Sequence, residues 1–330
     1  MTDPTLVGPW IHRFLLDHVR AERHLSLNTQ RSYRDTFVLL LTFAAKHGRR
    51  AADRLKLEHL SPKLLRSFLQ HLAQTRHSTA STVNQRLAAL RAWARFVGAQ
   101  SPEHTAWSGQ LRTLAFRKTA PPLLPYLERA EMRALLDAPD RRHVQGRRDA
   151  TLLLFLYNSG ARASEAADLT IGDLDWTAAA VTLHGKGNKC RRCPLWPATG
   201  KALQQLVGSR LPTERVFLNR QGHPLTRFGL HTLVERHTVT ARRQMPSLRA
   251  KKVSPHTIRH TTAMHLLQAG VDINTIRAWL GHASLQTTHL YAESDLKMKA
   301  RALRQCETSL TRPPSPRPSG SGLMRLLKSL

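Results

Sequence analysis

The sequence predicts two mainly α-helical domains, the second of which also contains a small antiparallel β-sheet. Three observations lead to this fold class. Hydrophobic residues recur at helical spacing over the first hundred residues, and a proline-rich segment without that spacing follows. The rest of the chain combines helical patterns with one β-hairpin signature. At 330 residues the chain is long enough for two domains that each bury a core.

The first domain, residues 1–98, is predicted to be a bundle of short helices. Ser61 followed by Pro62 is typical of a helix start, and Gly48 is typical of a helix end. A further helix is expected to begin at Ser78 or Thr79, because apolar residues then recur on one face up to position 97. The expected helices cover 10–19, 26–48, 64–72 and 79–97, and residues 99–125 are expected to be a linker.

The charge of the chain predicts a polyanionic partner. Lys and Arg number 51 against 22 Asp and Glu, which gives a formal net charge of +29. Residues 1–120 contribute +12 and the remainder +17, so the excess is spread over both halves and a single basic tail is excluded. Arginine suits bidentate contacts to phosphate, which favours nucleic acid. A soluble basic protein without such a partner is the simpler alternative.

Several basic or polar residues are candidates for contacts to DNA. Asn84, Arg91 and Arg95 are spaced to line one flank of the last helix of the first domain, and Lys118 lies in the linker. A solvated helix face would show the same pattern. A basic segment at 236–252, with Arg242 and Arg243 among its residues, is interpreted as a DNA-contacting loop or an exposed insertion.

The cysteines and the N-terminus indicate an intracellular protein. Three cysteines cannot staple a secreted fold of this size, and residues 1–6 lack the pattern of a signal peptide. The longest apolar run, 150–157, is far shorter than the ~20 residues of a membrane span. We expect a cytoplasmic, nucleoid-associated protein. Cys190 and Cys193 are interpreted as hairpin residues, because no second ligand pair stands at zinc-site spacing.

In the second domain, residues 126–305, Arg162 is the first candidate for phosphate binding. A buried helix is expected at 148–159, with a stop at Gly160, and Arg162 then lies at the start of the next helix. A helix N-terminus favours anions, because its free N–H groups and dipole attract negative charge. A salt bridge from Arg162 to Glu165 is the alternative role.

Lys186 is expected at the exposed tip of a β-hairpin. Short β-like runs at 181–184 and 190–195 flank the segment GKGNK, in which glycines surround the lysine. Such a loop can carry an ammonium group into a groove and withdraw it. An ordinary surface lysine is the alternative. The nucleotide-binding pattern GxxxxGK[ST] is missing.

The last third of the chain carries the sharpest cluster. Ser254 and Pro255 begin a helix on which His256, Arg259 and His260 share a face. His282 follows a predicted helix end, and Tyr291 stands nine residues later. No Asp or Glu stands at metalloprotease spacing from these histidines, so no metal is expected.

Together these residues match the needs of metal-free phosphodiester transfer. Fixed cations must neutralise the non-bridging oxygens of the phosphate, a nucleophile must attack, and an acid must protonate the departing sugar oxygen. Arginines and histidines supply the first, a tyrosine hydroxyl the second and a lysine the third. The six candidates are Arg162, Lys186, His256, Arg259, His282 and Tyr291, at intervals of 24, 70, 3, 23 and 9 residues.

With these motifs assembled, the chain resembles the tyrosine recombinase family of phage-integrase and Xer-like site-specific recombinases. The resemblance covers about residues 10–301. The matching motifs are SGARASE at 159–165, GKGNK at 185–189, HTIRH at 256–260, LGHAS at 280–284 and TTHLYA at 287–292.

This resemblance implies a mainly α clamp around duplex DNA, with an N-terminal helical core-binding, SAM-like domain and a catalytic domain that contains a small antiparallel sheet. Tyr291 would form a 3′-phosphotyrosyl bond, and Lys186 would protonate the 5′ oxygen. Arg162, Arg259 and His282 would hold the phosphate, and His256 would act as base and acid. The implied assembly is a tetramer on double-stranded DNA without cofactors, with related recombinases of the same element as candidate partners.

Two other functions and one segment stay open. A type IB topoisomerase shares these residues but religates its own strand, and a DNA-binding protein that no longer cuts would keep the fold. The role could be transposition, phage integration or dimer resolution. Residues 306–330 are expected to be a disordered tail that ends in a short amphipathic pattern, which either docks on a neighbouring protomer or is inert.

Overall fold

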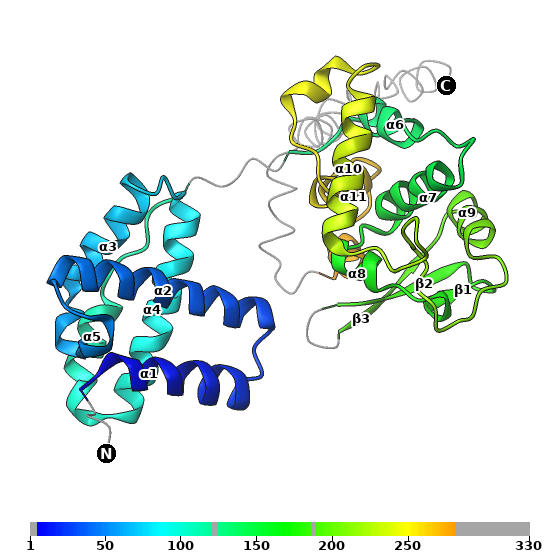
Figure 1. Cartoon of the computed structure of the whole chain (residues 1–330). Coiled ribbons are helices and arrows are strands. Elements are labelled where there is room, and N and C mark those ends of the chain that lie inside the picture. The colour runs from blue at the N-terminus through cyan, green and yellow to red at the C-terminus, as the bar shows by residue number, and fades with distance from the viewer. Residues whose placement is uncertain (1–4, 120–124, 186–188, 282–330) are drawn as a thin grey trace, which may run out of the picture. The chain divides into compact units, whose positions relative to one another are not determined.

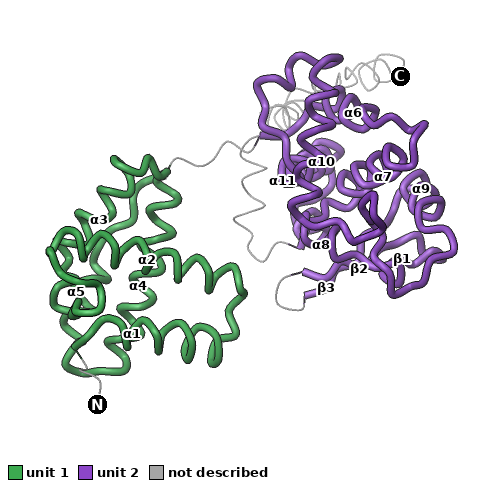
Figure 2. Tube along the Cα trace, in the orientation of Figure 1, with its two compact units in different colours: residues 1–122 green, residues 123–330 purple. Residues whose placement is uncertain are grey.

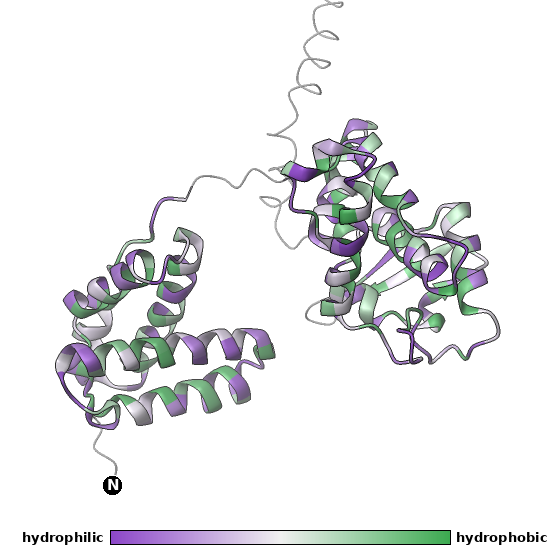
Figure 3. Cartoon of the chain, turned by 45° about the horizontal axis from the view of Figure 1, so that its top comes forward, coloured by the Kyte–Doolittle hydropathy of each residue, from purple (hydrophilic) through white to green (hydrophobic). Residues whose placement is uncertain are grey.

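The computed structural model describes residues 5–119, 125–185 and 189–281. The chain forms two compact units, residues 1–122 and 123–330 (Figures 1 and 2). In both, hydrophobic and hydrophilic positions alternate along the helices (Figure 3), as expected of helices that bury one face. The described part is mainly helical with one three-stranded antiparallel sheet, so the predicted fold class is confirmed.

Unit 1 is a helical bundle around α4. Each of α2, α3 and α5 packs on α4, whose buried residues include Leu87, Trp93 and Val97. The helices are α1 (Val7–Arg13), which continues as a π-helical stretch (Phe14–Glu22), α2 (Leu27–Gly48), α3 (Pro62–Gln74), α4 (Ala80–Gln100) and α5 (Thr105–Arg112).

Hydroxyl side chains start three of these helices. Ser26, Ser61 and Thr79 are N-cap residues, and each accepts a hydrogen bond from a backbone N–H of the first turn. The predicted start at Ser61 and Pro62 is therefore confirmed, and the next helix begins after Thr79, one of the two residues expected.

The segment 99–125 differs from the aperiodic linker that its prolines predicted. Helix α4 continues to Gln100, and α5 lies entirely inside the segment and packs against α4. Two buried residues of α5, Ser108 and Leu111, hold it there. Gly98 permits this approach, because a Cβ on it would come within 2.6 Å of the Ser108 side chain.

Unit 2 combines helices with a small sheet. The strands are β1 (Leu174–Asp175), β2 (Ala180–His184) and β3 (Cys190–Pro194), in the order β1-β2-β3 with antiparallel pairing. The helices are α6 (Arg129–Asp137), α7 (Val144–Ser159), α8 (Ala163–Asp168), α9 (Pro197–Val207), α10 (Arg227–Ala241), α11 (Pro255–Gln268) and α12 (Ile273–Leu280).

Helix α7 is the buried centre of unit 2, as its apolar run predicted. It packs between α9 and α11, and Leu152, Leu153, Phe155 and Leu156 are fully enclosed. It ends at Gly160, whose φ of +60° is left-handed. A Cβ at this glycine would also lie 2.5 Å from the Leu280 side chain, so the end of α7 and the end of α12 meet here.

Helices α9 and α10 were not predicted. On the buried side of α10, His237 and Thr238 stand beside Leu230, Leu233 and Val234, so polar residues interrupt the apolar stripe. Burial of His237 is possible because its ring bonds the Asp149 carboxylate. A periodicity of apolar residues cannot reveal such a helix, because its buried polar residues depend on partners in another helix.

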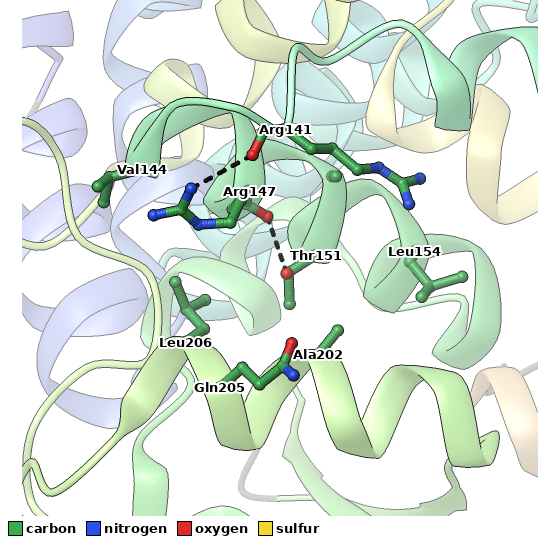
Figure 4. Close-up of a pocket in the computed structure, with 9 residues that line it drawn as sticks. Arg141, Val144, Arg147, Thr151, Leu154, Ala202, Gln205 and Leu206 are labelled. Carbon is green, nitrogen blue, oxygen red and sulfur yellow. Dashed lines mark hydrogen bonds between the residues drawn. The ribbon is translucent and has the colours of Figure 1, made fainter.

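A cavity of about 310 Å³ opens between α7 and α9 (Figure 4). Leu154 and Leu206 are among its apolar residues, and Arg141 and Arg147 lie beside it. None of the predicted site residues that the structure describes lines it. No helix within the described ranges is long and apolar enough to cross a membrane.

Candidate active site

Arg162 lies at the N-terminus of α8, as predicted, and also makes the predicted alternative contact. It is the N-cap residue, and its backbone N–H donates to Glu165 Oε2 at 2.8 Å. Its Nη1 donates to Glu165 Oε1 at 2.6 Å, and its Nη2 donates to the Gly281 carbonyl at 3.2 Å. The side chain is nevertheless 40% exposed. The bonds to described residues use two of the five N–H donors of the guanidinium, so a phosphate can still be bound.

Arg259 lies on α11 and joins the ends of two other helices. Its Nη1 donates to the Gly160 carbonyl at 2.6 Å and its Nη2 to the Leu280 carbonyl at 2.5 Å. Its exposure is only 2%. Ser254 caps α11 by accepting from the Thr257 N–H, and Pro255 occupies its first turn, so the predicted helix start is confirmed.

The C-terminus of α12 is where the arginines converge. Arg191 Nε donates to the Trp279 carbonyl at 2.8 Å, so three consecutive carbonyls, those of Trp279, Leu280 and Gly281, each accept from a different arginine. Carbonyls at a helix end lack intrahelical partners and carry partial negative charge, which favours cations. Gly281 has a left-handed φ of +62°, and it ends the helix as the sequence predicted.

His256 is exposed on the first turn of α11, and its ring lies 4.0 Å from that of buried His260 in an edge-to-face arrangement. Partial burial lowers its pKa below 6.5, and the positive charges of Arg259 and Arg162 lower it further. His231, an exposed residue of α10 that the sequence analysis did not select, acts in the same direction. The lowered pKa favours the neutral imidazole, which is the form that a general base requires.

Lys186, His282 and Tyr291 lie outside the described residues, but two of them directly follow residues of this site. Gly185 precedes Lys186, and a Cβ on it would lie 3.9 Å from Arg162 Nη1. Gly281, whose carbonyl accepts from Arg162, precedes His282. The structure thus brings Arg162, Arg259 and His256 together, and the chain connects this cluster to Lys186 and His282.

Glu165 and Arg191 also belong to this site, although the sequence indicated Glu165 only as an alternative partner of Arg162 and did not indicate Arg191. Glu165 is 4% exposed, and Arg191 binds it in bidentate fashion, with Nη1–Oε1 at 2.9 Å and Nη2–Oε2 at 2.7 Å. Burial alone would raise the pKa of Glu165, but the hydrogen bonds from Arg191 and Arg162 outweigh it and lower the pKa to about 2. The sequence signal was a carboxylate three residues after a candidate arginine.

The DNA-contact candidates of unit 1 partly serve its own packing. The amide of Asn84 bonds both the N–H and the carbonyl of Arg117, at 2.8 and 2.9 Å. The Arg91 guanidinium stacks over the Phe116 ring at 4.9 Å. Both therefore hold residues 116 and 117 against α4. Arg95 and Lys118 are exposed. DNA contact by these residues stays a prediction.

The segment 236–252 is only partly a loop and includes buried as well as exposed residues, and DNA contact by it stays a prediction. Residues 236–241 of the segment are the last residues of α10, and residues Pro246–Ala250 form a 3₁₀ helix. Lys251 donates to buried Glu131 at 2.6 Å. Arg242 is half-buried, and its guanidinium donates to the carbonyls of Leu248 and Lys251. Arg243 is exposed.

Cys190 and Cys193 lie on β3, so their interpretation as hairpin residues is confirmed. Cys193 is buried and Cys190 is exposed, because residues three apart on a strand face opposite sides. The Cys190 Sγ lies 3.2 Å from His184 Nδ1, and His184 Nε2 lies 2.9 Å from Asp173 Oδ1.

Comparison with known proteins places this arrangement in a family. Residues 125–298 match the model of the phage integrase family, and residues 11–100 match that of the phage integrase N-terminal SAM-like domain. The integrase/recombinase-type protein y4rC of Sinorhizobium fredii is 35% identical over 92% of each chain. Tyrosine recombinase XerD of Chlorobaculum tepidum is 30% identical over 88% of this chain and 95% of its own.

Two solved structures share the fold. The XerH site-specific recombinase bound to difH substrate has a TM-score of 0.67 at 22% identity, covering 86% of this chain and 82% of its own. The Tn1549 transposon integrase in complex with transposon right end DNA has a TM-score of 0.68 at 16% identity, covering 89% and 98%. The fold is that of DNA-bound recombinases and integrases of known structure. The chain belongs to the phage integrase family of tyrosine recombinases.

Proposed function

We propose that this protein is a site-specific DNA recombinase that cuts and rejoins strands through a 3′-phosphotyrosyl intermediate. The single observation that supports it most is the convergence of Arg162 and Arg259 on adjacent carbonyls at the end of α12. Two guanidinium groups held this close can clamp one phosphate, and the residue after that helix end is His282.

Each step of the proposed reaction is assigned to a residue of this chain. The Tyr291 hydroxyl attacks the scissile phosphate, and its proton passes to neutral His256. Arg162, Arg259 and His282 hold the non-bridging oxygens as negative charge accumulates. Lys186 protonates the departing 5′ oxygen. One phosphodiester is exchanged for another ester, so the bond energy is conserved and no ATP is needed. Rejoining reverses these roles.

The names of the relatives support a proposal for the biological setting. XerC and XerD proteins and a transposon integrase are among them, so we propose a tetramer that exchanges strands between two duplexes, in mobile-element integration or Xer-like resolution. Partner subunits from related recombinases of the same element are compatible with this proposal. The net charge of +29 supports binding to double-stranded DNA and a location on the nucleoid.

Trapping of the covalent intermediate tests the chemistry. A library of duplexes carrying random sequence and a nick beside it would be incubated with the protein, because a nicked substrate loses the short strand that reverses cleavage. DNA that stays attached to protein in SDS would be sequenced, and the modified peptide would be mapped by mass spectrometry. We expect the adduct on Tyr291, and none with Tyr291→Phe. Failure to form an adduct on any sequence would refute the mechanism.

A second assay separates recombination from strand relaxation. A plasmid with two copies of the selected site would be incubated with the protein, and both the flanking sequences and the linking number would be followed. Exchange of the flanks is the expected result. Relaxation without exchange would instead identify a topoisomerase.

A further inference from the structure

We propose that Arg191 is a positioning residue of the phosphate site, acting through Glu165 on Arg162 and through the Trp279 carbonyl on the end of α12. This inference rests on the proposed function, because the site it serves is the one assigned above. Arg191 lies on β3 and its side chain is 9% exposed. We do not place it in contact with the substrate.

Among the residues that the structure describes, four hydrogen bonds reach the Glu165 carboxylate, and Arg191 supplies two of them. Oε1 accepts from Arg162 Nη1 and Arg191 Nη1, and Oε2 accepts from the Arg162 N–H and Arg191 Nη2. These four bonds match the roughly four lone-pair positions of a carboxylate. Glu165 therefore fixes the position of Arg162 without depending on it alone for charge compensation.

Removal of Arg191 would change the charge balance around Arg162. Glu165 would remain ionised and buried with Arg162 as its remaining described cationic partner, and an uncompensated buried charge is costly. Its carboxylate would then compete with the scissile phosphate for the same guanidinium. Arg191 thus frees Arg162 for phosphate by sharing the charge of Glu165.

Arg191 also acts on the end of α12, through its Nε atom. Its Nε bonds the Trp279 carbonyl at 2.8 Å, and a Cβ on Gly281 would lie 3.1 Å from its Cδ. The side chain thus lies against the turn from which His282 follows. Arg191 also belongs to the same hairpin as Lys186, since β3 pairs with β2 at Leu183↔Arg191. One residue therefore contacts the segments that lead to three of the six predicted catalytic residues: Arg162, Lys186 and His282.

The neighbouring arginine provides a matched control. Arg192 is next to Arg191 on β3, but its side chain is 58% exposed and pairs with Asp175 at the surface. Both residues are positively charged and lie on the same strand, but their side chains point to opposite faces of the sheet. A change that depends on net charge or on the β2–β3 pairing would affect both variants equally.

The experiment measures the single-turnover cleavage rate and the DNA dissociation constant separately, using the nicked duplex selected above. We expect Arg191→Gln to slow cleavage by about 10- to 100-fold, the range for residues that orient a catalytic group, with DNA affinity within about twofold. Arg191→Lys keeps the positive charge but cannot form the bidentate pair. Its cleavage rate should therefore lie between those of Arg191→Gln and the unmodified protein. Arg192→Gln should cut like the unmodified protein.

The double variant Glu165→Gln with Arg191→Gln makes the test specific. If Glu165 competes with phosphate once Arg191 is gone, neutralising it should restore part of the cleavage rate. A purely structural role would give no such rescue per folded molecule. Should Arg191→Gln fail to fold, the double variant is compared with Glu165→Gln alone. A slower double variant would show that Arg191 also acts on the end of α12 through the Trp279 carbonyl, and an equal rate would overturn that action.

The outcomes separate this inference from the proposed function. An unmodified protein that forms no Tyr291 adduct overturns the proposed function itself. Two results with Arg191→Gln would overturn the positioning role and leave the proposed function standing. In the first, the adduct forms at the same rate as with the unmodified protein. In the second, the variant loses DNA affinity while its cleavage rate is unchanged.

Discussion

The same arginine–aspartate pair occurs in both units with opposite surroundings. In α2, Arg34 donates two hydrogen bonds to Asp35 Oδ1, at 3.0 and 2.8 Å. In α7, Arg148 donates two to Asp149 Oδ1, at 2.8 and 2.6 Å. The side chains of the first pair are 63% and 48% exposed, and those of the second are 11% and 2% exposed. Identical local chemistry therefore serves a solvated surface in one unit and a core in the other.

The contrast extends to the units as a whole. No charged side chain is buried in the described part of unit 1, whose buried polar residues are Thr36, Ser101 and Ser108. Unit 2 buries several, among them Glu131, Arg148, Asp149, Glu165 and Arg259. Unit 1 is thus held mainly by apolar packing, whereas unit 2 also depends on charge networks, one of which binds Arg162 through Glu165.

Asp149→Ala should produce the largest effect. Asp149 Oδ2 also accepts from Arg236 at 2.6 Å and bonds His237 Nε2 at 2.8 Å. Its loss leaves the Arg148 charge buried without its partner, which typically costs about 3–5 kcal/mol. Peptide-resolved hydrogen exchange should show faster exchange in α7 and α10 and unchanged exchange in α2 and α4. Equally faster hydrogen exchange in both units would contradict the claim that unit 2 depends more on buried charge than unit 1.

Acid should destabilise unit 2 before unit 1. Burial would raise the pKa of Glu165, but its arginine partners lower it from 4.5 to about 2. A carboxyl group whose pKa is lower in the folded state stabilises the fold above 4.5, and this contribution fades as the pH falls towards 2. For Glu165 it amounts to as much as ~3 kcal/mol, at about 1.4 kcal/mol per pKa unit.

Asp149 and Glu131 should add to this loss in the same direction. Burial opposes the shift in each, but bonds from His237 and Arg148 lower the pKa of Asp149, and bonds from Lys251 and Ser247 lower that of Glu131. The check is hydrogen exchange at stepped pH between 5 and 2. Protection lost in unit 1 first would contradict the assignment of buried charge to unit 2.

The sequence was sufficient where one local signal determines the structure. N-cap hydroxyls, Gly160, the 150–157 run and the hairpin around GKGNK each encode their own element, and all are observed. The sequence was insufficient where a polar residue is stabilised by a distant partner. His237 on α10 depends on Asp149 across 88 positions, and Arg191 depends on Glu165 and Trp279. Such contacts exist only after folding, so periodicity cannot indicate them.

Phe68→Leu in unit 1 should have a moderate effect. Phe68 is fully buried in α3 and its ring lies 5.6 Å from that of Phe43. The substitution keeps the site apolar and leaves a small void, at a cost of about 1 kcal/mol. Because no ionisable group is removed, the loss should be the same at pH 7 and pH 4. A loss that grows with acid would show that unit 1 also depends on buried charge.

Asp35→Asn should have the smallest effect and completes the comparison with Asp149. Both carboxylates follow an arginine that donates two hydrogen bonds to Oδ1, but Asp149 is buried and also binds Arg236 and His237. At a surface, water replaces the lost contact, and an exposed pair contributes only about 0–1 kcal/mol. Hydrogen exchange in α2 should stay within error of the unmodified protein, and salt should not change the result. If Asp35→Asn cost as much as the loss of Asp149, the Arg–Asp geometry itself would be the stabilising element, and burial would not explain the difference between the two units.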